Sequence, residues 1–320
     1  MKNKNVALAA AVAGLAMTAA AWGAEQVQES ALVEQHKAAA IKVGGPRYTD
    51  AAIHQCQGRP GIPAENRQII LPASRVFNNL YYVGLGWVGS WAVTTSDGIV
   101  LLDTLNSIKD VEETIIPGLK KFGLDPAQVK YIVLTHNHAD HVSGARYFVE
   151  HYKTRVIAAG PEWELMEKAT LRPGQDPPPA RDLTLTDGQT LKVGDTTFTF
   201  ILTPGHTPAS TSIIFPSTDD KGKKHLVALV GGITAQPNLA SQNMALEGLK
   251  PMIAFAKKNH VDVEIVDHPH VDDSMALLKA APTRKAGDAN GFIAGETGVQ
   301  NFLGMLTECY QANIARLEKK

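Results

Sequence analysis

The chain has 320 residues and a formal net charge of −1, with 31 Lys and Arg residues against 32 Asp and Glu residues. Hydrophobic residues make up 44% of it and charged residues 20%, which is the balance of a globular protein with enough apolar side chains for a sizeable core. No long basic run occurs, and the Lys cluster at 221–224 is typical of a solvated turn. We therefore expect no nucleic-acid partner.

The first residues follow the charged, apolar, small-residue order of a secretory signal peptide. Lys2 and Lys4 precede an Ala-rich apolar run over 6–21, and small residues then lead to Glu25. The run is short and Ala-rich for a membrane span, although an uncleaved anchor helix is the alternative. We expect a signal peptide over 1–24, export to the periplasm or the medium, and no stable membrane anchor, with the cleavage site left open.

The chain contains two cysteines, Cys56 and Cys309. Export would place them in an oxidising compartment, where one disulfide is permitted. The sequence alone leaves open whether the two thiols meet. Neither cysteine is near the His-rich segment described below, so neither is expected to bind metal.

Residues 25–72 form an N-terminal extension whose Gly- and Pro-rich stretches favour loops and short helices over strands. Beyond it, short apolar runs separated by Gly and Asp-Gly turns are typical of strands, and longer segments have helical spacing. In chain order, these patterns predict strands at 80–83, 90–94 and 98–102, a helix at 108–122, a strand at 129–134 and a helix at 144–152.

The second half of the chain repeats this order of elements. The patterns predict a hairpin of strands 191–193 and 196–202, then strands at 212–215 and 226–230 and a helix at 246–259. A strand at 263–266 and a terminal helix at 302–317 follow. Two similar halves can bury two sheets face to face with helices outside. We therefore expect an α/β fold over 73–320, a four-layer αββα sandwich with its functional loops gathered at strand ends.

Residues 135–141 read Thr-His-Asn-His-Ala-Asp-His and place four metal-binding side chains within six positions: His136, His138, Asp140 and His141. Alternate residues of an extended segment share a face, so the first two imidazoles are expected to point the same way. Imidazole and carboxylate together suit Zn²⁺ better than Ca²⁺ or Mg²⁺. Because the chain has 11 His residues in all, this density predicts a metal site rather than a merely polar loop.

This segment alone offers too few ligands for two metal ions, and further His residues occur at strand ends. His206 follows a Pro-Gly turn at the end of the predicted strand 196–202. His268 directly follows the predicted strand 263–266, with His270 as a competing candidate two residues later. We expect these residues to complete the metal-binding set.

These motifs resemble the metallo-β-lactamase superfamily, whose signature is H-x-H-x-D-H on an αββα fold. The resemblance covers the chain from about residue 76 to the C-terminus and is greatest for the third ("B-three") subclass of metallo-β-lactamases. It implies two zinc ions per chain. The two ligand sets that it implies are His136, His138 and His206 for one ion, and Asp140, His141 and His268 for the other. Asp103 matches a family position whose carboxylate orients a ligand His from behind.

The function implied by the resemblance is that of a secreted dizinc hydrolase acting on a small-molecule substrate. It would open a cyclic amide, a β-lactam ring, by attack of a metal-bound hydroxide. Asp140 would bind metal, and it is also the candidate for carrying the proton to the leaving group. Trp87, in the turn at 85–89, is a candidate for covering an apolar ring of the substrate, with ordinary packing against the sheet as the alternative.

The main alternative is a lactone, ester or thioester hydrolase on the same dizinc site. Lactonase, glyoxalase and many nuclease branches of the superfamily carry a metal-bridging Asp after the strand equivalent to 226–230, where this chain has Gly231 and Gly232. That absence weakens the alternative, whereas Val142 and Ala209, which stand where the family usually has Gly, keep it open. An iron oxygenase on the same scaffold and a non-catalytic zinc module are further alternatives. The sequence leaves the oligomeric state open.

Overall fold

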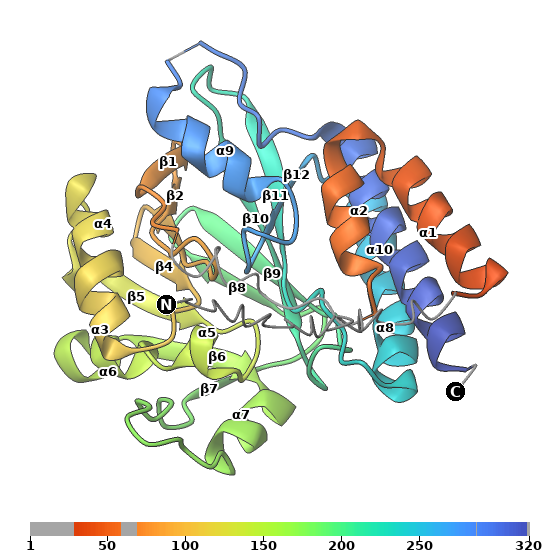
Figure 1. The fold of residues 1–320 in the computed structure, drawn as a ribbon. Helices are drawn as coiled ribbons and strands as arrows, with labels where there is room; N and C mark the ends of the chain where they lie inside the picture. The colour runs from red at the N-terminus through yellow and green to blue at the C-terminus, as the bar shows by residue number, and fades with distance from the viewer. Residues whose placement is uncertain (1–28, 59–68, 286, 319–320) are drawn as a thin grey trace, which may run out of the picture.

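The structure is a computed structural model that describes residues 29–58, 69–285 and 287–318. The predicted signal peptide lies outside the described residues. Two β-sheets pack face to face, and helices cover both outer faces, as Figure 1 shows. This confirms the predicted four-layer αββα sandwich.

The first sheet has seven strands in the order β1-β2-β3-β4-β5-β6-β7. Their bounds are β1 (Ser74–Phe77), β2 (Leu80–Tyr82), β3 (Trp91–Thr95), β4 (Gly98–Leu102), β5 (Val129–Val133), β6 (Arg155–Ala159) and β7 (Leu183–Leu185). Strands β1 to β4 pair antiparallel, and β4 to β7 pair parallel. Three of the predicted strands therefore correspond to β2, β3 and β4, and the fourth to β5.

Parallel pairing needs crossover connections, which helices supply on the outer face of this sheet. The crossover segments are α3 (Ile108–Asp110), the π-helical η3 (Val111–Ile115), α4 (Ile116–Lys121), η4 (Pro126–Gln128), α5 (Ala139–Val142), α6 (Ala145–Tyr152) and α7 (Gly160–Glu167). The predicted helix at 108–122 is thus α3, η3 and α4 in succession. The short helix α5 carries the second half of the His-rich segment.

The second sheet has five strands in the order β12-β11-β10-β9-β8. Their bounds are β8 (Thr190–Val193), β9 (Thr196–Leu202), β10 (Thr211–Thr218), β11 (Lys224–Val230) and β12 (Val263–Val266). All pair antiparallel except β11 and β12, which are parallel and joined by the crossover helix α8 (Leu239–Lys258). The remaining helical segments are α9 (Ser274–Ala280), η5 (Ala281–Thr283) and α10 (Gly295–Leu317).

The core between the sheets is made of side chains that both sheets turn inward. Val100 and Leu102 of the first sheet join Phe198, Phe200 and Phe215 of the second in one buried cluster. Burial of an aliphatic or aromatic side chain contributes about 1.5–3 kcal/mol relative to exposure. The strand ends are therefore fixed relative to one another, and the loops that follow them have a rigid base.

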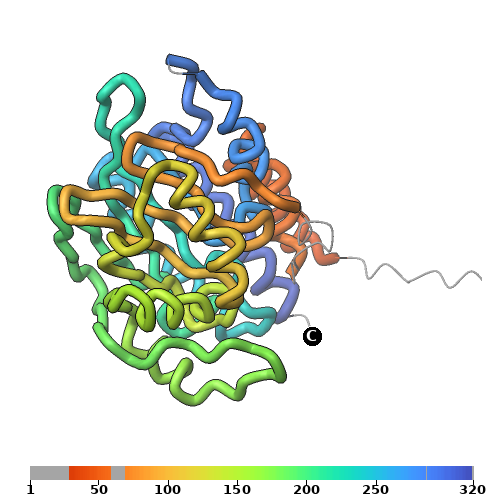
Figure 2. Tube along the Cα trace, turned by 90° about the vertical axis from the view of Figure 1, so that its left-hand side faces the viewer, coloured from red at the N-terminus to blue at the C-terminus, as the bar shows by residue number. Residues whose placement is uncertain are grey.

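The N-terminal extension is helical over most of 31–55, with α1 (Ala31–Gly44), η1 (Pro46–Tyr48) and α2 (Thr49–Gln55). Helix α1 lies along α10, as the red and dark-blue segments of Figure 1 and Figure 2 show. A disulfide joins Cys56, next to the end of α2, to Cys309 of α10 across 253 residues of sequence. The pairing that the sequence left open is therefore present.

Several elements differ from the sequence prediction. Helices α8 and α10 each begin seven residues before the predicted start, because large apolar side chains are sparse in their first two turns and do not repeat at helical spacing. The side chain of Asn238 caps α8 by accepting a hydrogen bond from the backbone of Ser241 at 2.9 Å. The sequence patterns did not predict β1, β6, β7, α7 or α9. Among the described helices, none is both long enough and apolar enough to cross a membrane.

Candidate metal centre

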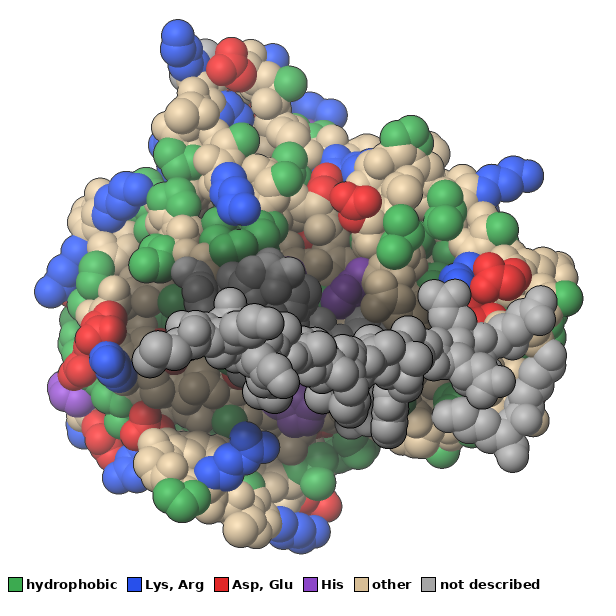
Figure 3. Space-filling model, in the orientation of Figure 1, with side chains coloured by type: hydrophobic (Ala, Val, Ile, Leu, Met, Phe, Trp, Pro, Cys, Tyr) green, Lys and Arg blue, Asp and Glu red, His purple; other side chains and the backbone are tan. Residues whose placement is uncertain are grey.

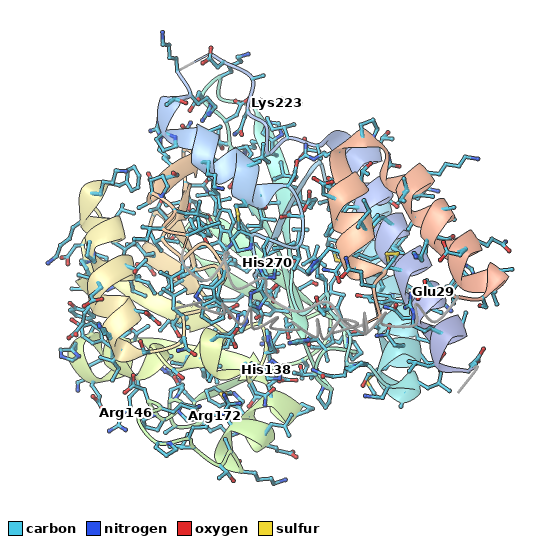
Figure 4. The ribbon with its side chains drawn as sticks, viewed as in Figure 1. Glu29, His138, Arg146, Arg172, Lys223 and His270 are labelled. Carbon is cyan, nitrogen blue, oxygen red and sulfur yellow. A yellow bond between two sulfur atoms is a disulfide. The ribbon has the colours of Figure 1, made fainter. Side chains whose placement is uncertain are left out.

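The six predicted ligand side chains converge at the ends of β5, β9 and β12. His136 and His138 lie in the loop after β5, and Asp140 and His141 lie on α5. His206 lies in the turn after β9, and His268 directly follows β12. The loop at 134–138 is not a strand, so the expectation of an extended segment holds only up to β5. Figure 4 shows His138 near the middle of the molecule, below His270.

The first group consists of His136, His138 and His206, whose ligand atoms all lie within 4.8 Å of one another. The Nε2 atom of His206 is 2.9 Å from the Nδ1 atom of His138. Two nitrogens bound to one tetrahedral zinc ion at about 2.0–2.1 Å would lie about 3.3 Å apart. The spacing of this group is therefore close to what a shared ion requires.

The second group consists of Asp140, His141 and His268, and its ligand atoms also lie within 4.8 Å of one another. The Nε2 atoms of His141 and His268 are 3.1 Å apart. The Oδ2 atom of Asp140 is 3.6 Å from each of them. His270, the competitor of His268, is in none of the candidate groups formed by the described residues.

Hydrogen bonds behind three of these imidazoles set their tautomers. Each Nδ1–H donates to an oxygen: His206 to the carbonyl of Thr234 at 2.5 Å, His268 to the carbonyl of Trp87 at 2.6 Å, and His141 to Oδ2 of Asp103 at 2.7 Å. In the neutral rings the Nε2 atoms then carry the lone pairs and face the group. This is the usual arrangement of a metal-binding His and the partner that orients it.

Burial and charge set the protonation of the centre. Burial lowers the pKa of His136 well below its usual value, and the neighbouring imidazoles act in the same direction. Burial likewise lowers the pKa of His138 to about 4, so both rings are neutral and have a free lone pair at pH 7. Burial would also lower the pKa of His141, but the carboxylates of Asp140 and Asp103 raise it to about 9.

His136 has a buried nitrogen without a partner, which tests whether a metal ion fits. The hydroxyl of Thr135 donates to Asp103 at 2.7 Å, so its oxygen accepts a hydrogen bond from Nδ1 of His136 at 2.9 Å. The Nε2 atom of His136 is then a buried lone pair with no hydrogen-bond partner. An unsatisfied buried polar atom costs about 1–3 kcal/mol. A cation within the first group would remove that cost.

Comparison with known proteins identifies the family. The model of the metallo-β-lactamase superfamily matches residues 87–220. The N-acyl homoserine lactonase AttM of Rhizobium radiobacter is 30% identical over 200 residues, which are 57% of this chain and 73% of that protein. The chain belongs to the metallo-β-lactamase superfamily. A hydroxyacylglutathione hydrolase of Mesorhizobium japonicum is 34% identical over 107 residues, 33% of this chain and only 36% of that enzyme's length.

Solved structures share the metallo-β-lactamase fold with this chain. The subclass B3 enzyme BJP-1 of Bradyrhizobium japonicum has a TM-score of 0.60 at 24% identity, covering 74% of this chain and 92% of that one. The FEZ-1 metallo-β-lactamase of Legionella gormanii has a TM-score of 0.68 at 22% identity, covering 79% and 98%. At these identities the likeness concerns the fold.

A cavity of about 650 Å³ opens beside the second group, with His138, Asp140, Trp87 and Arg172 in its lining. Figure 3 shows His side chains within the hollow in the middle of this face. Among the described residues that line the cavity, Arg172 is the one Lys or Arg side chain. Trp91, in contrast, is fully buried and donates its indole N–H to the carbonyl of Val266 at 3.0 Å, so it packs in the core.

Glu162 is a structural residue of the centre that the sequence patterns did not reveal. Its carboxylate is fully buried at the start of α7. It accepts three hydrogen bonds, from the backbone of Asn137 at 2.9 Å, the hydroxyl of Thr207 at 2.8 Å and the backbone of Ala209 at 2.8 Å. Glu162 therefore ties the loop of His138 to the turn of His206. The one signal in the sequence is an acidic residue close behind an apolar strand.

Asp267 is the second residue missed, and it lies behind His136. Its Oδ2 atom accepts a hydrogen bond from the backbone of Gly232 at 2.8 Å and is 3.8 Å from Nδ1 of His136. It forms a third candidate group with His136 and His141. Nδ1 of His136 already donates a hydrogen bond to Thr135, and it lies on the opposite side of the ring from the unpartnered Nε2 atom. Asp267 lies on the Nδ1 side. We therefore regard Asp267 as a support of the centre.

Proposed function

We propose that this chain is an exported dizinc hydrolase that opens the cyclic amide of a β-lactam. One observation carries the proposal. Six side chains form a three-His group beside an Asp-His-His group. Gly231 and Gly232 occupy the place where other branches of the family have a bridging Asp, so no side chain there can join the two groups. Export rests on the N-terminal sequence pattern.

The residues of each group fit zinc and leave it catalytically competent. Three protein ligands per ion leave an open position, which distinguishes a catalytic zinc site from a closed structural one. Zinc bound there would supply Lewis acidity and activate water at neutral pH. The neutral His136 and His138 offer lone pairs without first losing a proton.

Asp140 is the candidate for moving a proton to the leaving group. Burial would raise its pKa, but His141 and His268 lower it below the usual value, so the carboxylate is ionised at pH 7. It lines the cavity as well as the second group and can therefore reach a substrate. Trp87 on the cavity wall can cover an apolar ring, and Arg172 can pair with a substrate carboxylate.

A lactone, ester or thioester hydrolase is the second candidate function. It is supported by relatives found by sequence, which include an N-acyl homoserine lactonase and two hydroxyacylglutathione hydrolases. The two hydroxyacylglutathione hydrolases match this chain over about a third of their own length, 36% and 35%. The same metal groups would serve either reaction, and the cavity wall would select the substrate.

A substrate panel with metal analysis tests the proposal. The zinc-loaded protein, expressed as the full chain with its export signal, is assayed on nitrocefin, a carbapenem, an N-acyl homoserine lactone and a hydroxyacylglutathione. We expect two zincs per chain and a kcat/KM for β-lactams at least a hundredfold above that for the other substrates. His206→Ala is the matched inactive control. Intact β-lactams at high enzyme concentration, with turnover of a lactone or thioester, would establish the second candidate instead.

A further inference from the structure

We propose that the helical N-terminal extension positions His206, acting through Gln55 and the loop at 233–236 under the constraint of the Cys56–Cys309 disulfide. The inference rests on the proposed function only in that His206 binds metal. It assigns a role in the centre to a segment that precedes the sandwich in sequence.

The loop at 233–236 holds His206 at both its ring and its backbone. The Nδ1–H of His206 donates to the carbonyl of Thr234, which leaves Nε2 facing His138. The side-chain amide of Gln236 donates to the carbonyl of His206 at 3.2 Å. A shift of this loop would therefore change both the tautomer and the direction of the imidazole.

The loop itself is neither helix nor strand and depends on side chains around it. The hydroxyl of Thr234 donates to Oε1 of Gln55 at 3.2 Å, and the hydroxyl of Tyr310 donates to the carbonyl of Ile233 at 2.6 Å. Gln55 is 3% exposed and Tyr310 is 5% exposed, so water does not compete strongly for these bonds. A third support is Gln242 of α8, whose amide donates to carbonyls of the same loop.

The disulfide joins the residues next to these two supports. Cys56 follows Gln55, and Cys309 precedes Tyr310, so the covalent bond fixes α2 against α10 at the point where both contact the loop. Arg316 of α10 adds a hydrogen bond to the carbonyl of Cys56 at 2.9 Å. Because the cross-link and the two supports are contiguous, the extension cannot separate from α10 without moving Gln55.

The second metal group has different supports. His141 is oriented by Asp103, and His268 by the carbonyl of Trp87. Helix α2 does come near this side, because His54 packs against His270 with ring centroids 5.7 Å apart. His270, however, is in none of the ligand groups that the described residues form. Loosening the extension should therefore weaken the His136–His138–His206 group and leave the other group nearly unchanged.

The test compares variants of the full-length chain by zinc competition with a graded chelator. Gln55→Met keeps the volume and removes the acceptor, and Thr234→Val removes the donor. Cys56→Ser with Cys309→Ser removes the cross-link. Gln57→Met, at an exposed neighbouring position, is the matched control. Loss of a group that orients a ligand typically weakens metal binding about 10–100-fold. We expect the affinity for one of the two zinc ions to fall about tenfold, and the affinity for the other to stay within twofold of the wild-type value.

A second readout does not depend on metal. In the metal-free protein, the nitrogen NMR signals of His206 should change from the Nδ1–H tautomer in the wild type to a mixture of tautomers in Gln55→Met. Equal weakening of both zincs, or a lower melting temperature with unchanged zinc affinity and an unchanged His206 tautomer, would overturn the inference. Wild-type protein that binds two zincs but spares β-lactams would refute the proposed substrate alone. A wild type that binds no zinc would count against both.

Discussion

Replacing Glu162 by Gln tests whether a buried carboxylate holds the first metal group together. Glu162 accepts hydrogen bonds from the loop that carries His138 and from the turn that carries His206. One of its oxygens accepts from Thr207 and Ala209, and the other accepts from Asn137. Gln keeps the shape of the side chain, but its NH₂ group must face at least one of these donors.

The magnitude follows from the bonds that are lost. A hydrogen bond to a charged group contributes about 1.5–3 kcal/mol, and an unsatisfied buried donor costs about 1–3 kcal/mol. Removing a buried charge offsets part of this loss, because burial already raises the pKa of Glu162. We expect the free energy of unfolding of the metal-free protein to fall by about 2 kcal/mol. Zinc affinity of the first group should fall about tenfold.

Urea unfolding and chelator competition measure these two quantities. Glu164→Gln is the matched control, because Glu164 lies on the same helix and has an exposed ion pair with Lys168 at 3.9 Å. Such a pair contributes at most about 1 kcal/mol. If Glu162→Gln unfolds like Glu164→Gln and binds both zincs with wild-type affinity, the carboxylate does not hold the two loops together.

Three further predictions concern other charged residues. Arg172→Ala should raise KM about tenfold for β-lactams that carry a carboxylate and leave kcat unchanged, as steady-state kinetics would measure. Asp103→Ala should weaken zinc about 10–100-fold at the His141 group, with a smaller loss at the His136 group, because Asp103 also holds the hydroxyl of Thr135 that orients His136; the same chelator competition measures both. Burial raises the pKa of Glu264 to about 7, so the folded state favours the protonated form. That stabilisation is complete below pH 4.5 and is lost as pH rises through 7, so Glu264→Gln should flatten the decline of melting temperature between pH 5 and 8.

The sequence predicted the parts of this molecule that depend on local pattern. The strand at 98–102 has a continuous apolar run, and β4 forms there with its apolar residues buried on both faces. In β5 the apolar residues Ile132 and Val133 are buried in the same way, whereas Lys130 near its start is exposed. The four residues of the His-rich segment are close in sequence and therefore close in space. His206 and His268 could be added because each directly follows a predicted strand.

Other features depend on tertiary contacts and have no local signal. The partners of Glu162 lie 25 to 47 residues away in sequence. The cysteines of the disulfide are separated by 253 residues. Gln55 contacts Thr234 across 179 residues. Each of these contacts exists only after the sheets and helices have packed, so composition and periodicity could not reveal them.

Each metal group draws its ligands from both halves of the sandwich. His136 and His138 follow β5 of the first sheet, whereas His206 follows β9 of the second. In the other group, Asp140 and His141 again belong to the first half and His268 to the second. An ion bound to either group would therefore cross-link the two sheets at one edge. Because a ligand that binds only the folded state stabilises it by about 4 kcal/mol at a thousandfold excess over Kd, zinc should contribute to folding as well as to catalysis.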